Sequence, residues 1–145
     1  MSLLYLLMGG GNNVGSDPGA SGVMITLPAT LSINVSGALS VTGVLTVKSD
    51  GYLTSTNNTA LSWITPVVEQ LVDDYEVRLT SVSGSPPNSG SVLSTWLNLG
   101  STKAWSWNVG APQTSKTFTG TLEIRRVAVP SDIGSCTVSV SLTQG

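Results

Sequence analysis

Hydrophobic and polar residues alternate with a period of two along several stretches of the chain. Successive side chains of a strand point to opposite faces, so each stretch predicts a strand with one buried and one exposed face. The polar partners are mostly Ser and Thr, and Thr favours strands because its Cβ is branched. The predicted strands, bounded by their apolar members, are Leu31–Val35, Leu39–Val47, Tyr75–Leu79, Trp105–Val109, Phe118–Ile124 and Cys136–Leu142.

Turn-forming residues separate these stretches at short intervals. About seven short strands at such a spacing predict an all-β fold, an antiparallel β-sandwich. A helix is expected only at Pro66–Asp74, where apolar residues have helical spacing, and it would span two turns at most. The predicted turns are Ser49–Gly51, Thr56–Asn58, Gly84–Asn88, Gly100–Ser101, Gly110–Pro112 and Pro130–Asp132.

The amino-terminal segment begins with a short apolar run that is followed by glycines. This run is far shorter than the roughly 20 residues that cross a bilayer, and no Lys or Arg precedes it as in a signal peptide. We therefore expect an extended arm over residues 1–22, a sandwich domain over residues 23–145 and no membrane span. We predict that the arm attaches the protein to neighbouring subunits through Leu3, Leu4, Tyr5, Leu6, Leu7 and Met8.

The composition is poor in charge and rich in hydroxyls. Charged residues make up 10% of the chain and the net charge is −2, against roughly 25% charged residues in typical soluble domains. A nucleic-acid partner is not expected, because the few basic residues form no patch beyond Arg125 and Arg126. A surface of hydroxyls suits a face that another chain covers, so the composition favours a protein that works by contact.

Few residues in the chain could support catalysis. There is no histidine, which removes the commonest general base and the Ser-His-Asp arrangement. The single cysteine, Cys136, lies in phase with the apolar face of a strand and is expected to be a small buried residue. Asp73, Asp74 and Glu76 could offer oxygen ligands to calcium, but they match no loop signature, so ion binding there stays open. We predict no enzyme, no cofactor and no metal.

The four tryptophans have two possible roles. Large aromatic side chains fill the space between the sheets of a small sandwich, and exposed aromatic faces stack on sugar rings. The core role is favoured for the alternating pair Trp105 and Trp107, which share one face of a strand. Trp96, Trp105 and Trp107 remain candidate contacts for a glycan, and their exposure distinguishes the two roles.

A resemblance to a known family is carried by seven segments within residues 37–145: Val47–Gly51, Leu61–Pro66, Tyr75–Ser81, Ser94–Leu99, Ala104–Trp107, Thr121–Arg125 and Thr137–Thr143. Together they resemble small structural proteins of tailed bacteriophages. The ordered set of tryptophan positions is the most distinctive part of the resemblance, whereas Val67–Asp74 is more apolar than the glycine-rich loop expected there. The resemblance implies an immunoglobulin-like or fibronectin-like sandwich in a head or tail protein, and it brings no catalytic residues.

Together these features predict a non-enzymatic accessory subunit on the capsid or tail surface of a bacteriophage virion, assembled in the bacterial host cytoplasm. Its partners would be other virion proteins and further copies of itself, in a trimer or ring. The alternative is a receptor- or carbohydrate-binding module at a tail tip or fibre, whose ligand would be a host surface glycan. A secreted adhesin domain is a third interpretation, and it requires cleavage of the amino terminus.

Overall fold

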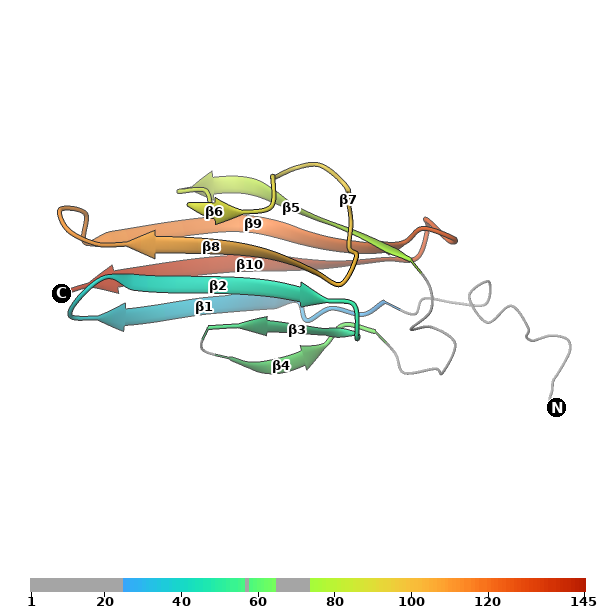
Figure 1. Cartoon of the computed structure of the whole chain (residues 1–145), viewed down its shortest axis with the longest axis horizontal. Coiled ribbons are helices and arrows are strands. Elements are labelled where there is room, and N and C mark those ends of the chain that lie inside the picture. Colours follow the sequence, from blue (N-terminus) through green and yellow to red (C-terminus); the bar gives the residue numbers. More distant parts are fainter. Residues whose placement is uncertain (1–24, 57, 65–73) are drawn as a thin grey trace, which may run out of the picture.

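The fold is a sandwich of two five-stranded β-sheets, with the order β1-β10-β9-β5-β7 in the first sheet and β4-β3-β2-β8-β6 in the second (Figure 1). The computed structural model describes residues 25–56, 58–64 and 74–145. The strands are β1 Thr30–Gly37, β2 Val41–Lys48, β3 Tyr52–Ser55, β4 Asn58–Ser62, β5 Tyr75–Gly84, β6 Ser89–Gly90, β7 Leu97–Asn98, β8 Thr102–Val109, β9 Ser115–Arg126 and β10 Ile133–Gln144. The predicted all-β sandwich is confirmed.

The expected number of strands, about seven, is wrong, because the described residues form ten. The additional strands are short. β6 and β7 have two residues each and β3 has four, and such lengths are too short to show an alternating pattern. Their pairing with β8, β5 and β2 defines them, and pairing between distant segments leaves no local signal in the sequence.

The first sheet is built on β9 and β10, which are 12 residues long and pair antiparallel from Ser115↔Thr143 to Arg125↔Ile133. Both alternate between buried and outward positions along most of their length. Such long matched strands stabilise the sheet because each inward side chain packs on the second sheet while the backbone hydrogen bonds are completed by the neighbour. The remaining strands of this sheet add to either side of this pair.

β1 pairs with β10 in parallel, from Thr30↔Thr137 to Gly37↔Gln144. The prediction of a purely antiparallel sandwich is therefore wrong at this edge. The alternation of β1 shows which of its side chains are buried. Parallel and antiparallel pairing give the same alternation, so the pattern does not reveal the direction of β1 relative to its neighbour. A parallel pair needs a long connection, and here the whole domain lies between the two strands in sequence.

The space between the sheets is filled by aliphatic and aromatic side chains. Trp63, Trp105 and Trp107 have no exposed surface. Trp107 packs on Phe118 of the facing sheet with 5.1 Å between ring centroids, and Trp63 meets Tyr75 edge-on at 4.9 Å. The core role that the alternation favoured for Trp105 and Trp107 is confirmed, and Cys136 is also buried as expected.

One predicted core position, Leu39, is wrong. Leu39 is 78% exposed, whereas Val41, Leu45 and Val47 on the same phase are buried. β1 ends at Gly37 in one sheet and β2 begins at Val41 in the other, so residues 38–40 cross between the sheets. A residue in such a crossing has no facing strand to pack against, whatever its place in the alternation.

Two predictions lie outside the described residues. These are the arm over residues 1–22 with its apolar run, and the possible helix at Pro66–Asp74 except for its last residue. The predicted turns lie between successive strands, with Asn57 outside the described residues.

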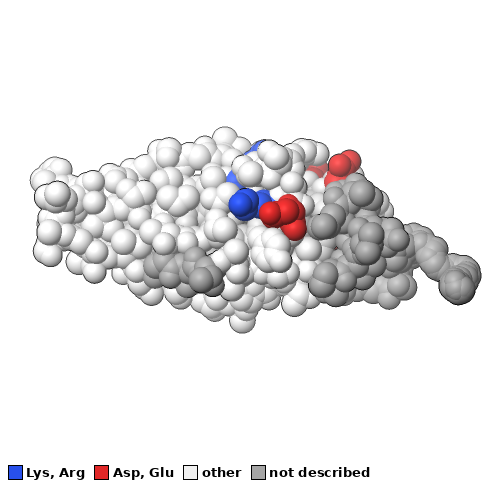
Figure 2. Space-filling view, turned by 60° about the horizontal axis from the view of Figure 1, so that its bottom comes forward, with Lys and Arg blue, Asp and Glu red and all other residues white. Residues whose placement is uncertain are grey.

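Charge is distributed unevenly along the sandwich. In the described residues, every charged side chain except that of Lys116 lies toward the end that carries the β9–β10 turn. Figure 2 shows one face, on which the charged groups lie in one half and the half toward the carboxyl-terminal end is neutral. The strand ends at that neutral end present Ser, Thr and Asn side chains, such as Ser36, Thr143 and Ser115.

Candidate functional site

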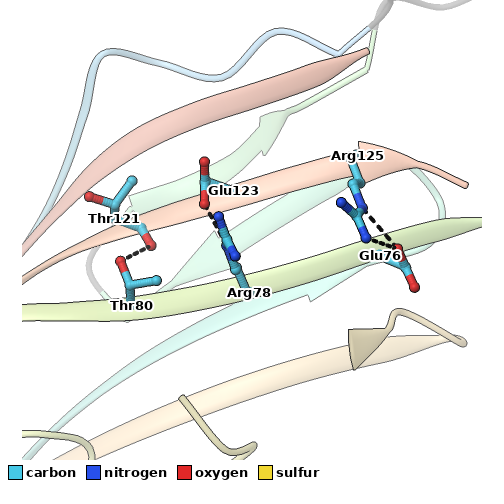
Figure 3. Close-up of polar contacts among 6 residues, drawn as sticks. All are labelled: Glu76, Arg78, Thr80, Thr121, Glu123 and Arg125. Carbon is cyan, nitrogen blue, oxygen red and sulfur yellow. Dashed lines mark hydrogen bonds and ion pairs between the residues drawn. The ribbon is translucent and has the colours of Figure 1, made fainter. Parts of the chain in front are cut away.

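Two cross-strand ion pairs lie on the outer face of β5 and β9. Arg78 is directly opposite Glu123, and Glu76 is directly opposite Arg125. The Arg78 Nε donates to Glu123 Oε1 at 2.6 Å, and the Arg125 Nη2 lies 2.8 Å from Glu76 Oε1. Figure 3 shows the two pairs side by side, with each guanidinium pointing at the carboxylate of the other strand. Opposite charges in directly opposed positions stabilise the pairing of the strands.

Trp96 lies over both arginines. The Cζ atoms of Arg78 and Arg125 are 4.4 and 4.0 Å from the centroid of its ring, which is cation–π geometry. The Trp96 side chain is half-buried, and it is the one tryptophan of the four with exposed surface. We call Glu76, Arg78, Trp96, Glu123 and Arg125 the Trp96 cluster. It brings one aromatic ring, two cations and two anions together on a sheet face.

The segment that carries Trp96 is fixed to β5 on both sides. Before it, the backbone N–H of Ser94 donates to the carbonyl of Leu79 at 2.9 Å, and Ser94 has a positive φ of 66° that reverses the chain. After it, β7 pairs with β5, and the Leu99 N–H donates to the Tyr75 carbonyl at 2.8 Å. These bonds hold the indole over the sheet, so its position is set by the backbone as well as by the arginines.

A shallow hollow lies beside the cluster on the same face. Its volume is about 210 Å³, and its lining includes the hydroxyl-bearing residues Thr121, Ser135 and Thr137. Ser135 is directly opposite Glu123, and Thr137 is directly opposite Thr121, so the hollow over β10 and β9 continues into the ion pairs over β9 and β5. The face therefore offers a ring, paired charges and a set of hydroxyls in one continuous area.

The structure separates the tryptophans that the sequence left as candidate ligand contacts. Trp105 and Trp107 have no exposed surface and offer no face to a ligand, so a contact role is wrong for these two. Trp96 keeps exposed surface and remains a candidate. The arm residues, Leu3 to Met8, lie outside the described residues.

Sequence analysis did not bring the four charged members of the Trp96 cluster together, and it considered Glu76 only as a possible ion ligand. A signal for them exists: the pattern Glu-x-Arg occurs at Glu76–Arg78 and again at Glu123–Arg125. If two such segments are antiparallel neighbours in register, each Glu faces an Arg. The signal becomes useful only once β5 and β9 are known to be neighbours, which the alternation does not reveal.

The structure describes two of the three acidic residues that suggested an ion site, and the carboxylate of one of them, Glu76, is in an ion pair. The Glu76 carboxylate is held by Arg125, and the backbone carbonyl of Asp74 accepts from the Val127 N–H at 3.0 Å. Asp73 lies outside the described residues. In the described part of the chain, no three residues of the His, Cys, Asp and Glu types lie together as a metal site requires.

The Cys136 side chain has little chemical reactivity in this position. It is buried in the core, and this burial raises the pKa of its thiol, with a backbone hydrogen bond at Leu31 opposing the shift. Because the thiolate is the reactive form, a raised pKa makes the side chain a poor nucleophile at neutral pH.

Comparisons with known proteins give no match: no family model matches the chain, and neither a curated protein nor a solved structure does. Within the described ranges, no helix has the length and apolar character needed to cross a membrane.

Proposed function

We propose that this protein is a non-enzymatic structural protein of a bacteriophage virion, an accessory subunit on the capsid or tail surface. The observation that supports this most directly is the neutral, hydroxyl-coated end of the sandwich, where Lys116 is the one charged side chain among the described residues. Soluble domains ordinarily carry charge over their whole surface, which keeps them apart in solution. A domain with one end nearly free of charge is suited to being surrounded by neighbours in an assembly.

The arrangement of the central strands supports an immunoglobulin-like topology for the sandwich. In that fold, strands C, F and G are neighbours in one sheet, and strands B and E are neighbours in the other. Here β5, β9 and β10 are neighbours in one sheet and β2 and β8 in the other, in the same chain order. The edge strands depart from the pattern, since a β3–β4 hairpin extends the second sheet. Such a topology is compatible with many functions. The proposal therefore rests on the neutral, hydroxyl-coated end of the sandwich and on the arm.

The proposed attachment element is the arm, through Leu3, Leu4, Tyr5, Leu6, Leu7 and Met8. An apolar strand adds to the edge of a neighbouring sheet through main-chain hydrogen bonds, and its alternate side chains fill pockets on the partner. Further copies of the chain would complete a trimer or a ring, because virion surfaces offer symmetric sites.

Deletion of residues 1–11 tests the attachment. We expect the deleted protein to keep its thermal unfolding midpoint and to be lost from purified particles, as measured by quantitative mass spectrometry of the virions. A matched control replaces residues 3–8 with Ser and Gly at unchanged length, and it should behave like the deletion if the apolar side chains supply the affinity. Full occupancy of the particles by the deletion variant would exclude attachment through the arm.

A second candidate function, a receptor- or carbohydrate-binding module at a tail tip or fibre, is favoured by one observation. Trp96 has exposed surface, and a hollow with hydroxyls in its lining lies on the same outer face of the sheet. An aromatic ring together with hydroxyls is suited to binding a glycan. The two functions are compatible in one protein, because the arm and the outer face of β5, β9 and β10 are separate parts of the chain.

A further inference from the structure

We propose that the outer face of β10, β9 and β5 is a binding surface for a neutral glycan chain, with the Trp96 ring stacking on one sugar and the hollow lined by Thr121, Ser135 and Thr137 accepting another sugar of the same chain. This inference rests on the second candidate function above and does not depend on attachment through the arm. It assigns the ligand class and the residues of the site.

The Trp96 ring is suited to stacking on a sugar because it is partly exposed and held in place. A pyranose ring has an apolar face of C–H groups, which packs on an aromatic face, and polar edges that remain solvated or hydrogen-bonded. Arg78 and Arg125 hold the ring at 4.4 and 4.0 Å, and the Ser94 and Leu99 backbone bonds hold its segment. A ring that is already fixed loses little conformational freedom when a ligand binds, which favours affinity.

The hollow supplies the hydrogen-bonding half of the site. Hydroxyl side chains both donate and accept hydrogen bonds, as sugar hydroxyls do, so Thr121, Ser135 and Thr137 are complementary to a polyhydroxylated ligand. β10 and β5 lie on either side of β9, so the hollow and the strand beneath Trp96 are on the order of 10 Å apart, two strand spacings. One short oligosaccharide can reach both.

The charges of the face favour a neutral ligand over an anion. Each arginine of the Trp96 cluster is already paired with a carboxylate, so two cations and two anions cancel. A phosphate or an acidic sugar would have to compete with Glu76 and Glu123 for the guanidinium groups. A neutral sugar can instead hydrogen-bond to these fixed groups without disturbing the pairs.

A row of threonines crosses the outer face of the sheet. Thr30, Thr137, Thr121 and Thr80 stand in one register row across β1, β10, β9 and β5. Their hydroxyls can hydrogen-bond to sugar hydroxyls, and their methyl groups can pack on sugar C–H groups. The row therefore extends the polar part of the proposed site on the face that carries the Trp96 ring.

Binding can be tested with the full chain and a defined set of neutral tetrasaccharides: maltotetraose, cellotetraose, mannotetraose and chitotetraose. Tryptophan fluorescence is the primary measurement, since Trp63, Trp105 and Trp107 are fully buried and Trp96 alone can meet the ligand. Isothermal titration calorimetry supplies the affinity. We expect saturable binding of at least one probe, accompanied by a change in the fluorescence.

Variants locate the binding. Trp96→Ala should weaken the binding by about tenfold or more, because it removes the stacking surface. Thr137→Val keeps the shape of an exposed side chain and removes its hydroxyl, so it should weaken binding by several-fold while the protein stays folded. Thr143→Val is the matched control on the same strand, remote from the hollow, and it should bind like the wild type.

Three outcomes would overturn the proposal: no saturable binding of any probe, equal binding by the wild type and Trp96→Ala, or equal binding by Thr137→Val and Thr143→Val. A change of oligomeric state in Thr137→Val, measured by analytical ultracentrifugation without any glycan binding, would assign the face to protein association instead. Incorporation of Trp96→Ala into virions is a separate measurement. It reports on the structural role and is expected to be normal even if glycan binding is lost.

Discussion

Trp96 lies over the guanidinium of Arg125, with 4.0 Å between the Arg125 Cζ and the centroid of the ring. The tryptophan belongs to the segment between β6 and β7, and the arginine belongs to β9, so the contact joins parts of the chain that are distant in sequence. It fastens a segment with little regular structure onto the middle of a sheet. The same contact leaves part of the indole exposed at the surface.

A double-mutant cycle with Trp96→Leu and Arg125→Met should measure a coupling energy of about 0.5–1 kcal/mol, the usual value for a partly exposed cation–π pair. The quantity is the free energy of unfolding in urea. A control cycle pairs Trp96→Leu with Lys116→Met at the other end of β9, and it should be additive. A coupling near zero in the first cycle would show that the backbone bonds alone place the ring.

Trp105 and Trp107 provide a matched pair for the contribution of a buried hydrogen bond. Both lie on the inner face of β8 with no exposed surface, but the Trp107 Nε1 donates to the Ser85 carbonyl at 3.2 Å. The Trp105 Nε1 is buried with no partner among the described residues. Trp107→Phe should therefore destabilise the protein more than Trp105→Phe, by about 1 kcal/mol.

The measurement is chemical denaturation of both variants at equal pH and temperature. Both substitutions remove a similar volume, so the cavity contributions largely cancel in the difference. Equal losses of stability in the two variants would contradict the prediction. They would show that the indole N–H of Trp105 stabilises the protein as much as the hydrogen bond from the Trp107 indole to Ser85 does.

Gly120 should not tolerate a side chain. An added Cβ would lie 2.3 Å from the carbonyl oxygen of Thr80 and 2.6 Å from the ring of Phe118. The register of β5 against β9 shifts between Ser81 and Ser83, beside this glycine, which brings the two backbones close together. Gly120→Ala is expected to cost about 2–4 kcal/mol of stability, because backbone must move to relieve the overlap.

Gly37→Ala is the control for this effect, because its nearest neighbour would be the Val41 Cγ2 at 3.4 Å, an ordinary contact. Thermal unfolding followed by circular dichroism should show a large decrease in Tm for Gly120→Ala and a small change for Gly37→Ala. Similar values of Tm for the two variants would contradict the close approach of β5 and β9.

The buried ion pair between Arg126 and Asp132 should be costly to break on one side only. The side chains are 4% and 2% exposed, with 3.6 Å between Nη1 and Oδ2, and Asp132 Oδ1 also accepts from the Ile25 N–H. Asp132→Ala leaves a buried guanidinium without its charge partner, so we expect a loss of about 3–5 kcal/mol.

The double variant Arg126→Leu with Asp132→Ala should recover part of that loss, because it buries no unpaired charge. Urea denaturation of the single and double variants measures the recovery. A double variant less stable than Asp132→Ala alone would show that Arg126 is stabilised mainly by other groups around it.

Cys136 should react slowly with iodoacetamide in the folded protein and rapidly in denaturant, since it is buried. Burial raises its pKa in the folded state, so the thiol contributes stability that is fully present below the unfolded pKa and lost as the pH rises through the folded value. Stability should therefore begin to decline as the pH approaches 9.0, the ordinary value from which burial raises the pKa of this thiol.

The variant Cys136→Ala isolates this contribution from those of Lys and Tyr, which also titrate in alkaline solution. Denaturation at neutral pH and at alkaline pH should show a smaller pH-dependent loss for the variant than for the wild type. Identical losses in the two proteins would show that the thiol does not contribute to the alkaline decline.

Much of the core was predictable from period-two alternation, because this pattern is a property of the backbone itself. In β10, successive side chains point to opposite faces, so Cys136, Val138, Val140 and Leu142 are buried together while their neighbours are outward. The exception at Leu39 arises where the chain leaves one sheet for the other. The sequence keeps alternating through such a crossing, but no strand lies opposite the crossing residues, so their apolar side chains stay exposed.

The candidate site was only partly predictable. Trp96 was one of three tryptophans considered, and nothing local distinguishes it from Trp105, which is fully buried. The two Glu-x-Arg segments that hold it are 45 residues apart at Arg78 and Glu123. Their meeting depends on the pairing of β5 with β9, which is decided by contacts between distant segments.

The sequence by itself determined the all-β class of the described residues, which faces of most long strands are buried, and that the chain contains no histidine. Each of these follows from local backbone geometry or from composition. Only the tertiary structure decided that β1 runs parallel to β10, that there are ten strands in the described residues, and that Trp96 lies over Arg78 and Arg125. The physical reason is that strand partners are selected by the packing energy of the whole core. A short segment of sequence does not reveal that energy, because most of the contacts are with distant segments.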